Sequence, residues 1–265
     1  MKSSLIGKLV LLGMVVFSGL QTVVADVQYS FTTISVPGAG GTYAIGINAS
    51  GQIVGNFIDP VEAGGNPQGF LDVGGNFTTI DVPGATLTIA YGINASSQIL
   101  GSYIDSTTWR GFLDIGGNFT TINVPGANNT FAIGINDSGQ IVGDYYSQTV
   151  SPGFLLMGGS VTTIDVPGAY QTLPSGINDS GQIVGQYYGK TGLHGFLDMG
   201  GSLTTIDVPG AYQTEASGIN DSGQIVGSYS ESTGDYGFLA TPLVVPEPRT
   251  SLVLTGCLIG LFALA

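Results

Sequence analysis

The sequence predicts an all-β protein, a five-bladed β-propeller with four short strands in each blade. Three observations support this prediction: one segment is repeated five times, each copy holds four short β-like runs, and 44 of the 265 residues are Gly whereas only 9% are charged. So little charge disfavours a protein of exposed helices. With 43% hydrophobic residues, the chain still has enough apolar surface for a folded core.

The repeat has a period of about 42 residues and is marked by three short motifs. Gly-Ile-Asn and Val-Pro-Gly-Ala each recur at spacings of 46, 42, 42 and 42, and Gly-Phe-Leu recurs at a uniform 42. The four extra residues of the first copy therefore lie in the loop around residues 59–65. The Gly-Ile-Asn copies begin at Gly46, Gly92, Gly134, Gly176 and Gly218.

The third copy shows where the four strands of a blade are expected. Asn136-Asp137-Ser138-Gly139 and Gly158-Gly159 are turn sequences, because Asn and Asp cap the backbone and Gly takes positive φ. Apolar residues occupy both faces of the runs between these turns, which predicts sheets covered on both sides. The predicted strands are 131–135, 140–146, 153–157 and 161–166.

The two ends of the repeat region predict how the ring closes. The last copy lacks a fourth strand after Gly237-Phe238-Leu239, and the region begins with an orphan β-like run at residues 29–36. If that run completes the last blade, a ring of five closes and both sheet edges are hidden. The alternative architecture, an open solenoid, needs polar caps at both ends, and the sequence shows none.

Residues present in all five copies are predicted to be structural, because a ring that binds one ligand must break its own symmetry. The Ile of each Gly-Ile-Asn triplet is assigned to the blade core: Ile47, Ile93, Ile135, Ile177 and Ile219. The aromatic residue after each Gln-containing strand is assigned to packing, with a sugar-facing ring as the alternative: Phe57, Tyr103, Tyr145, Tyr187 and Tyr229.

Charge and composition exclude several classes of function. A net charge of −13 repels a phosphate backbone, so no nucleic acid is expected as a partner. One Cys (Cys257) and one His (His194) cannot form a disulfide or a thiolate zinc site, and we expect no metal and no cofactor. Asn-Asp-Ser-Gly resembles the start of a calcium loop, but the bidentate Glu is missing, which favours a hairpin turn.

Both ends of the chain carry features of export. Residues 1–25 are predicted to be a signal peptide, because Lys2 and Lys8 precede an apolar run at 9–17 and small or β-branched residues precede Asp26. The propeller then spans residues 26–242, and residues 243–265 form a sorting or anchor segment. We expect a helix in the signal peptide and an apolar helix at 252–265.

The C-terminal segment resembles the PEP-CTERM sorting signal of bacteria. Pro246, Glu247 and Pro248 match its tripeptide one for one, and an apolar run follows them. This resemblance implies a transient membrane anchor and an exosortase-type enzyme as partner. The repeats also resemble the extracellular HAF repeat in Ile-Asn and Gly-Gln-Ile-Val-Gly, although Gly replaces the Ala of His-Ala-Phe throughout. That resemblance implies a secreted bacterial repeat protein without an assigned activity.

The candidate binding residues lie where the copies differ, mainly in the loops between second and third strands. Trp109 and Arg110 form the leading pair, because an indole stacks on a sugar face while a guanidinium donates a fork of hydrogen bonds. The other candidates are Tyr146, Tyr188 and His194. The sequence therefore predicts a cell-surface or extracellular-matrix protein that binds a ligand such as exopolysaccharide.

No catalytic residue is predicted, and we do not expect an enzyme. Asp81, Asp165 and Asp207 occupy equivalent positions in their copies, and equivalent environments do not separate the pKa values of an acid and a base. The alternative from another class is a secreted carbohydrate-active enzyme, a glycosidase or lyase, on the same scaffold. That alternative requires non-repeated acids clustered at the centre of the ring.

Overall fold

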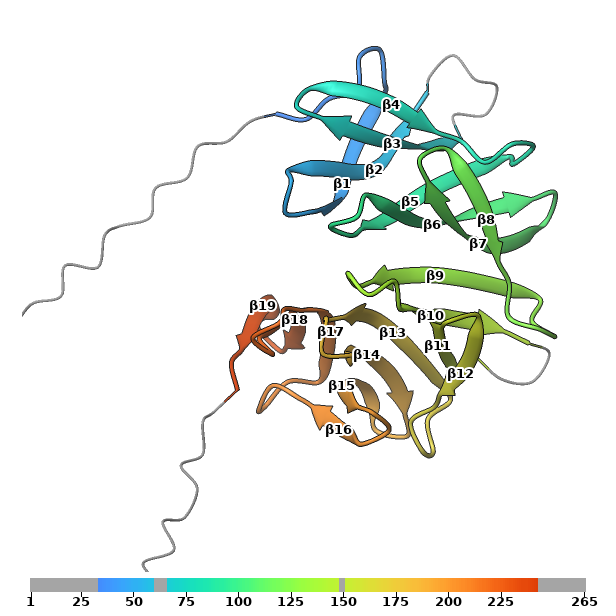
Figure 1. The fold of residues 1–265 in the computed structure, drawn as a ribbon. Helices are drawn as coiled ribbons and strands as arrows, with labels where there is room; N and C mark the ends of the chain where they lie inside the picture. Colours follow the sequence, from blue (N-terminus) through green and yellow to red (C-terminus); the bar gives the residue numbers. More distant parts are fainter. Residues whose placement is uncertain (1–32, 60–65, 148–150, 243–265) are drawn as a thin grey trace, which may run out of the picture. The chain divides into compact units, whose positions relative to one another are not determined.

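The protein is a five-bladed β-propeller, as the sequence predicted (Figure 1). The computed structural model describes residues 33–59, 66–147 and 151–242, and all its strands belong to the unit Ile34–Ala265. Each blade is one antiparallel sheet; the first four have four strands and the last has three. No helix in these described stretches is long and apolar enough to cross a membrane. The helices expected within residues 1–25 and 252–265 lie outside them.

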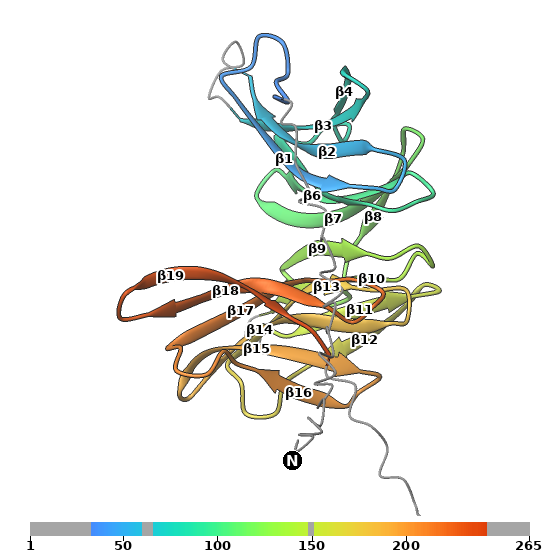
Figure 2. The same ribbon diagram turned by 90° about the vertical axis from the view of Figure 1, so that its left-hand side faces the viewer.

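The blades follow one another in chain order and are numbered 1 to 5 (Figure 2). Blade 1 contains β1 (Gly41–Ile47), β2 (Gln52–Ile58), β3 (Pro67–Val73) and β4 (Asn76–Ile80). Blade 2 contains β5 (Leu87–Ile93), β6 (Gln98–Asp105), β7 (Thr108–Ile115) and β8 (Asn118–Ile122). Blade 3 contains β9 (Asn129–Ile135), β10 (Ile141–Tyr146), β11 (Gly153–Met157) and β12 (Ser160–Ile164). Blade 4 contains β13 (Gln171–Ile177), β14 (Gln182–Gly189), β15 (Gly192–Met199) and β16 (Leu203–Ile206). Blade 5 contains β17 (Gln213–Ile219), β18 (Ile225–Glu231) and β19 (Gly234–Ala240).

The repeated Gly and Asp residues hold the hairpins. Gly139 in the first turn of blade 3 has φ 74°, and Gly158 and Gly159 in its last turn have φ 56° and 82°. In blade 2, the Asp114 carboxylate accepts a hydrogen bond of 2.7 Å from Gly117 N in the same hairpin. Both predicted turn types are therefore confirmed, and the repeated Asp is a turn cap.

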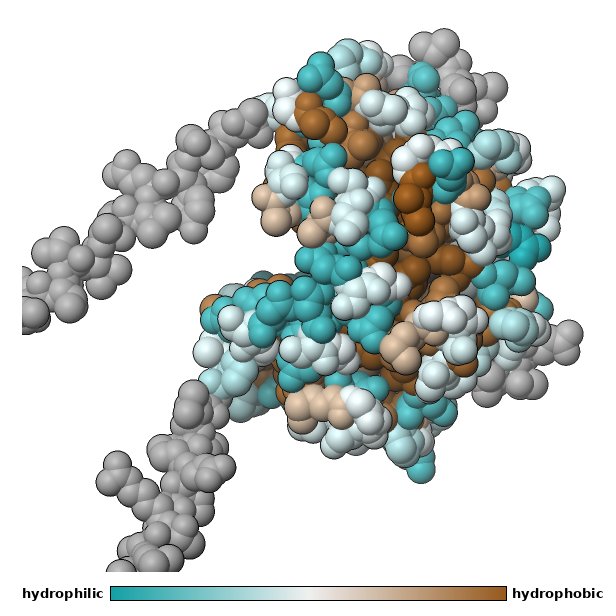
Figure 3. Space-filling model, in the orientation of Figure 1, coloured by the Kyte–Doolittle hydropathy of each residue, from teal (hydrophilic) through white to brown (hydrophobic). Residues whose placement is uncertain are grey.

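The core of each blade is built on the Phe of Gly-Phe-Leu. Phe70, Phe112 and Phe154 are completely buried, and Phe196 is 1% exposed. The final Gly of Gly-Gln-Ile-Val-Gly makes room for this ring: a Cβ on Gly143 would lie 3.0 Å from Phe154 Cε1 and would collide with the Phe131 carbonyl. Apolar residues also gather between neighbouring sheets, where successive blades pack together (Figure 3).

Near the axis of the ring, neighbouring blades are joined by a ladder of Asn side chains. In the first four copies, the Asn of Gly-Ile-Asn donates from Nδ2 to the carbonyl of the next one, at 3.0 to 3.2 Å: Asn48 to Asn94, Asn94 to Asn136, Asn136 to Asn178 and Asn178 to Asn220. The same Nδ2 donates to the Gln that closes its own turn, as in Asn136 to Gln140 Oε1 at 2.7 Å. One side chain thus fixes a turn and a blade contact together.

Gly before the Asn allows this close approach. A Cβ on Gly134 would lie 3.1 Å from the Ser175 carbonyl and 3.4 Å from Gly176 Cα in the next blade. That spacing is tighter than a side chain tolerates without a shift of the backbone. The Gly-Ile-Asn triplet is therefore an interblade contact motif.

The series of blades remains open between blade 5 and blade 1. Ile47 is 67% exposed, whereas Ile93 and Ile177 are 8% exposed, so its assignment to the blade core is wrong. Ile47 lies on the first blade, and no preceding blade covers it in the described part of the chain. The strand predicted to complete blade 5 begins at residues 29–32, outside the described residues, and residues 33–36 are described but are not a strand.

The Asn ladder predicts a measurable contribution to stability. In Asn136→Ala, Gln140 N, Gln140 Oε1 and the Asn178 carbonyl each lose a hydrogen bond in a site where Asn136 is only 4% exposed. We expect the free energy of unfolding to fall by about 1 to 3 kcal/mol in urea denaturation. The matched control is Asn118→Ala, whose exposed amide donates only within its own hairpin and should cost less than about 0.5 kcal/mol. Equal losses for the two variants would contradict a role between blades.

Candidate functional site

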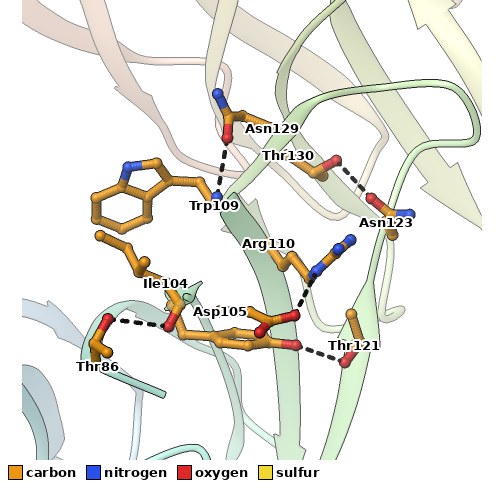
Figure 4. Close-up of polar contacts among 10 residues, drawn as sticks. Thr86, Ile104, Asp105, Trp109, Arg110, Thr121, Asn123, Asn129 and Thr130 are labelled. Carbon is orange, nitrogen blue, oxygen red and sulfur yellow. Dashed lines mark hydrogen bonds and ion pairs between the residues drawn. The ribbon is translucent and has the colours of Figure 1, made fainter. Parts of the chain in front are cut away.

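The leading predicted pair, Trp109 and Arg110, does not form one site. The two residues are successive in β7, so their side chains project to opposite sides of the sheet (Figure 4). Arg110 Nε donates to Asp105 Oδ2 at 3.3 Å, while the indole lies on the other side, beside Ile104. They therefore cannot bind the same sugar ring from one face.

Trp109 is instead the first member of a row of aromatic rings that crosses from blade 2 to blade 3. Its ring centroid is 5.3 Å from that of Phe131 in β9, and Phe131 meets Tyr146 of β10 edge to face at 5.7 Å. Trp109, Phe131 and Tyr146 are all half-buried. We call these three residues the aromatic row.

Two amides of neighbouring strands fix the ends of the aromatic row. Asn129 Oδ1 accepts a hydrogen bond of 2.9 Å from Trp109 N, which ties β7 to the next blade (Figure 4). Gln171 Nε2 in blade 4 donates to the Tyr146 hydroxyl at 2.7 Å. The row is thus held by three blades, and its rings are positioned before any ligand arrives.

A buried carboxyl group lies next to the aromatic row. Asp144 pairs directly with Phe131 across the β9–β10 ladder and is 7% exposed. Burial raises the pKa of Asp144 to about 7. Burial also raises the pKa of Tyr91, and of Tyr146, and the Asp144 charge adds to both shifts. The Gln171 hydrogen bond acts in the opposite direction on the pKa of Tyr146.

The remaining predicted residues divide between two faces. Tyr188 is 42% exposed and its charge adds to the raised pKa of Tyr146, so these two candidates lie near one another. His194 occupies the same repeat position as Arg110. Its Nδ1 lies 2.8 Å from Asp207 Oδ2 and its ring lies against Tyr187 at 5.3 Å. Tyr146 therefore belongs to the aromatic row and Tyr188 lies near it. Arg110 and His194 lie on the other face of their blades.

The centre of the ring is lined by repeated residues. A hollow of about 320 Å³ there is formed by the Ile-Asn dipeptides of all five copies and the residues that follow them. The carboxylates of Asp137 and Asp179 accept hydrogen bonds from Ala95 N and Asp137 N, at 2.7 and 2.8 Å. Within the described residues, no group of three or more His, Cys, Asp or Glu could hold a metal ion. These acids therefore serve the contacts between blades.

Two members of the site, Tyr91 and Phe131, were missed by the sequence analysis. The signal was present: the residues equivalent to Tyr91 are Ile45, Ile133, Ser175 and Ser217, so an aromatic residue appears in one copy alone. Asp144 likewise replaces Asn, Ser or Gln of the other copies. The sequence could not show that these non-repeated residues, which belong to different copies, lie close together in the folded protein.

Among known proteins, similarity to this chain is found in solved structures. No protein-family model matches the chain, and no curated protein matches it. Among solved structures, virginiamycin B lyase from Staphylococcus aureus is 11% identical with a TM-score of 0.46, over 74% of this chain and 69% of that one. A streptogramin B lyase is 15% identical with a TM-score of 0.48, over 77% and 70%. A chain of a nidogen/laminin complex is 15% identical with a TM-score of 0.48, over 75% and 74%.

The buried Asp144 predicts a specific pH dependence of stability. Its pKa is about 7 in the folded protein and about 3.9 in an unfolded chain, so the unfolded state loses this proton first as pH rises. The free energy of unfolding should therefore fall between about pH 4 and pH 7 and level off above it, by up to about 4 kcal/mol. Urea denaturation across this range measures the fall.

The Asp144→Asn variant cannot ionise at this position and should lose that part of the pH dependence. Asp105→Asn is the control, because Asp105 is exposed and should leave the fall in place. Parallel pH profiles for wild type and Asp144→Asn would contradict a raised pKa.

Proposed function

We propose that the protein is exported to the cell surface or extracellular matrix and acts there by binding a polysaccharide through the aromatic row. The observation that carries the proposal is the row itself, Trp109, Phe131 and Tyr146 in consecutive ring contacts. Each ring stands at a position where the other copies have a different residue in most cases. The row is thus an aromatic surface at which blades 2 and 3 depart from the five-fold repeat.

Aromatic rings suit sugars because the apolar face of a pyranose stacks on them while its hydroxyls reach nearby polar groups. The row offers both: partly exposed rings, and the amides of Asn129 and Gln171 at its ends. The rings are held by packing and by these amides. Little side-chain entropy is then lost when a ligand binds.

Charge argues for an uncharged or amine-bearing glycan. The chain carries a net charge of −13, and the nearest ionisable side chain with a raised pKa is the acid Asp144. Arg110, the cation next in sequence to Trp109, is on the other face and is paired with Asp105. A polymer rich in uronic acids or sulfates would be repelled.

Binding without catalysis is the function that the geometry supports better. The acids that line the central hollow are repeat-equivalent, and Asp137 and Asp179 are engaged with backbone N–H groups. The non-repeated acid near the row, Asp144, is buried beside tyrosines. An acid–base pair for glycoside hydrolysis needs a second carboxyl group in a different environment at the same site. A secreted carbohydrate-active enzyme remains an outcome of the binding experiment below, detected as cleavage of the bound glycan.

The proposal includes delivery by the two terminal signals, which lie outside the described residues. Residues 1–25 direct export, and Pro246-Glu247-Pro248 with the apolar segment behind them serve as a PEP-CTERM-like sorting signal. The tail then holds the protein in the membrane until an exosortase-type enzyme acts. This route places the propeller where exopolysaccharide is found.

Substitution of Trp109 tests the binding site. On an array of neutral and amine-bearing glycans, we expect Trp109→Ala to weaken binding of the best wild-type glycan by about 5- to 100-fold, the effect of removing an aromatic anchor. Arg110→Ala is the matched control, next in sequence but on the opposite face, and it should change the affinity less than about twofold. A wild-type protein that binds no glycan, or equal losses for both variants, would exclude the aromatic row as a glycan site.

Substitution of the tripeptide tests the sorting signal. The wild-type protein should be cut near Pro246-Glu247-Pro248, so its mature form should lack Cys257 and appear outside the membrane fraction. Replacing all three residues by Ala should leave the full-length chain in that fraction. Mass spectrometry of the C-terminal peptide decides: an exported wild-type protein that still ends at Ala265 would contradict processing.

A further inference from the structure

We infer that the Asp144 carboxyl group binds the ammonium group of an amino sugar, so that the glycan held by the aromatic row is a hexosamine polymer with free amines. The inference rests on the proposed glycan binding and specifies its ligand. Three features of the described residues carry it: a carboxyl group without a hydrogen-bond donor, a Pro in the next blade, and the aromatic side chains around the acid.

The first feature is the unpaired carboxyl group. Asp144 is 7% exposed, and none of the described residues donates a hydrogen bond to its side chain. A buried polar group without a partner is costly and uncommon in a folded protein. The other buried acids of the described stretches each accept a backbone N–H bond of 2.6 to 2.7 Å in their own hairpin: Asp72, Asp114 and Asp198.

The second feature is a Pro that explains why the donor is missing. Ser102 holds the position of Asp144 in blade 2, and its hydroxyl accepts a bond of 3.3 Å from Ala132 N in blade 3. One blade further on, the equivalent of Ala132 is Pro174, which has no N–H to donate. Pro174 lies over Gly153, the residue that pairs with Asp144, because a Cβ on Gly153 would collide with the Pro ring. The acid and the missing donor therefore occur at the same interface between blades.

The third feature is the set of aromatic side chains near the carboxyl group. Phe131 pairs directly with Asp144 and contacts both Trp109 and Tyr146. Tyr146 follows Asp144 by two residues in β10, so both side chains lie on one face of the sheet. Tyr91 of β5 lies close enough for the Asp144 charge to raise its pKa. A cation is attracted both by a carboxylate and by the faces of such rings.

The carboxyl group can be reached from solvent. Among the described residues, no side-chain polar atom is both closed off from solvent and without a hydrogen-bond partner. The Asp144 oxygens accept no bond from these residues, so they keep a contact with solvent. The aromatic row beside them is partly exposed. A sugar stacked on Phe131 or Tyr146 can therefore place a substituent at the carboxyl group.

An ammonium group is the sugar substituent that suits this position. A sugar hydroxyl can donate to Asp144, but it carries no charge and leaves the buried carboxylate uncompensated. An ammonium group has three N–H donors and also neutralises the charge. An N-acetylated amine is neutral and does not. The expected ligand is therefore the polymer with free amines rather than its acetylated form.

Three β-1,4-linked trisaccharides that differ only at carbon 2 test the inference: those of glucosamine, N-acetylglucosamine and glucose. In calorimetric titration of the full chain at pH 7, the glucosamine trimer should bind about 10- to 100-fold more tightly than the other two, as expected for a hydrogen bond to a charged group. Asp144→Asn should bind the three trimers within about threefold of one another, because it keeps the shape of the side chain and loses the charge.

Asp105→Asn is the matched control, because it removes the same single charge at an exposed site on the other face of the sheet. It should keep the preference for the glucosamine trimer. Equal losses of preference in both variants would assign the effect to the net charge of −13 and would overturn the inference.

The trisaccharide experiment also separates this inference from the proposed function. Equal wild-type affinities for the three trimers would overturn the inference and leave glycan binding by the aromatic row in place. Binding of none of the three would also overturn it, and the glycan array then decides separately whether the proposed function fails as well.

Asp144 is the group at this place that changes charge near neutral pH. Tyr91 and Tyr146 have pKa values raised above the ordinary tyrosine value, so both keep their protons at pH 6. Tyr188 of β14 acts on the pKa of Tyr146. The neighbours of Asp144 from the other strands do not titrate: Phe131 of β9, Gly153 of β11 and Pro174 of β13.

Proton release gives a second readout that does not depend on affinity. The free Asp144 carboxyl group, with a pKa of about 7, is largely protonated at pH 6 and must lose its proton to pair with an ammonium group. Calorimetry in two buffers of different ionisation enthalpy should show about one proton released per glucosamine trimer and none per glucose trimer. Asp144→Asn should release none with either. Binding of the glucosamine trimer to the wild type without proton release would contradict the pairing.

Discussion

The contact on which the rest of this structure depends is the hydrogen bond from the Asn amide of Gly-Ile-Asn in blades 1 to 4 to the next blade. The amide group closes its own hairpin through a Gln and reaches the carbonyl of the following Asn in the same geometry at four places. This bond needs the backbones to lie close together, and at Gly46, Gly134 and Gly176 a Cβ would lie within 3.4 Å of its nearest neighbours. The same Gly-Ile-Asn contact thus sets the distance between successive blades. The hydrophobic core of each blade packs within that distance.

The candidate binding site of this five-copy protein lies where the copies differ in sequence. The repeated acids cap turns or accept backbone N–H groups, as Asp114 and Asp137 do. The departures from the repeat, Tyr91, Trp109, Phe131 and Asp144, come from two adjacent blades and meet at one place. The proposed glycan binding uses this aromatic surface, and the net negative charge is the reason that we propose an uncharged or amine-bearing polymer. The proposed function rests on this asymmetry.

The Asn ladder joins blades 1 to 5 in order, but within the described residues it does not join blade 5 to blade 1. A repeat array has two ends, and each end exposes apolar residues and an unpaired strand edge unless another segment covers them. Ile47 and Val226 are exposed at these ends, whereas their equivalents in the other blades are buried or partly buried.

The sequence by itself determined the class of fold, the number of blades and nearly every strand, because these follow from local patterns that recur at a constant period. It also located the turns, where Asn, Asp and Gly act within a few residues. The structure decided what depends on contacts between copies. Trp109 and Arg110 are neighbours in sequence, yet a strand sends successive side chains to opposite faces, so they do not cooperate. Phe131 and Tyr146 lie next to Trp109 because strands of adjacent blades lie side by side. Ile47 belongs to the same repeat position as Ile93, and only its place at the end of the array leaves it exposed.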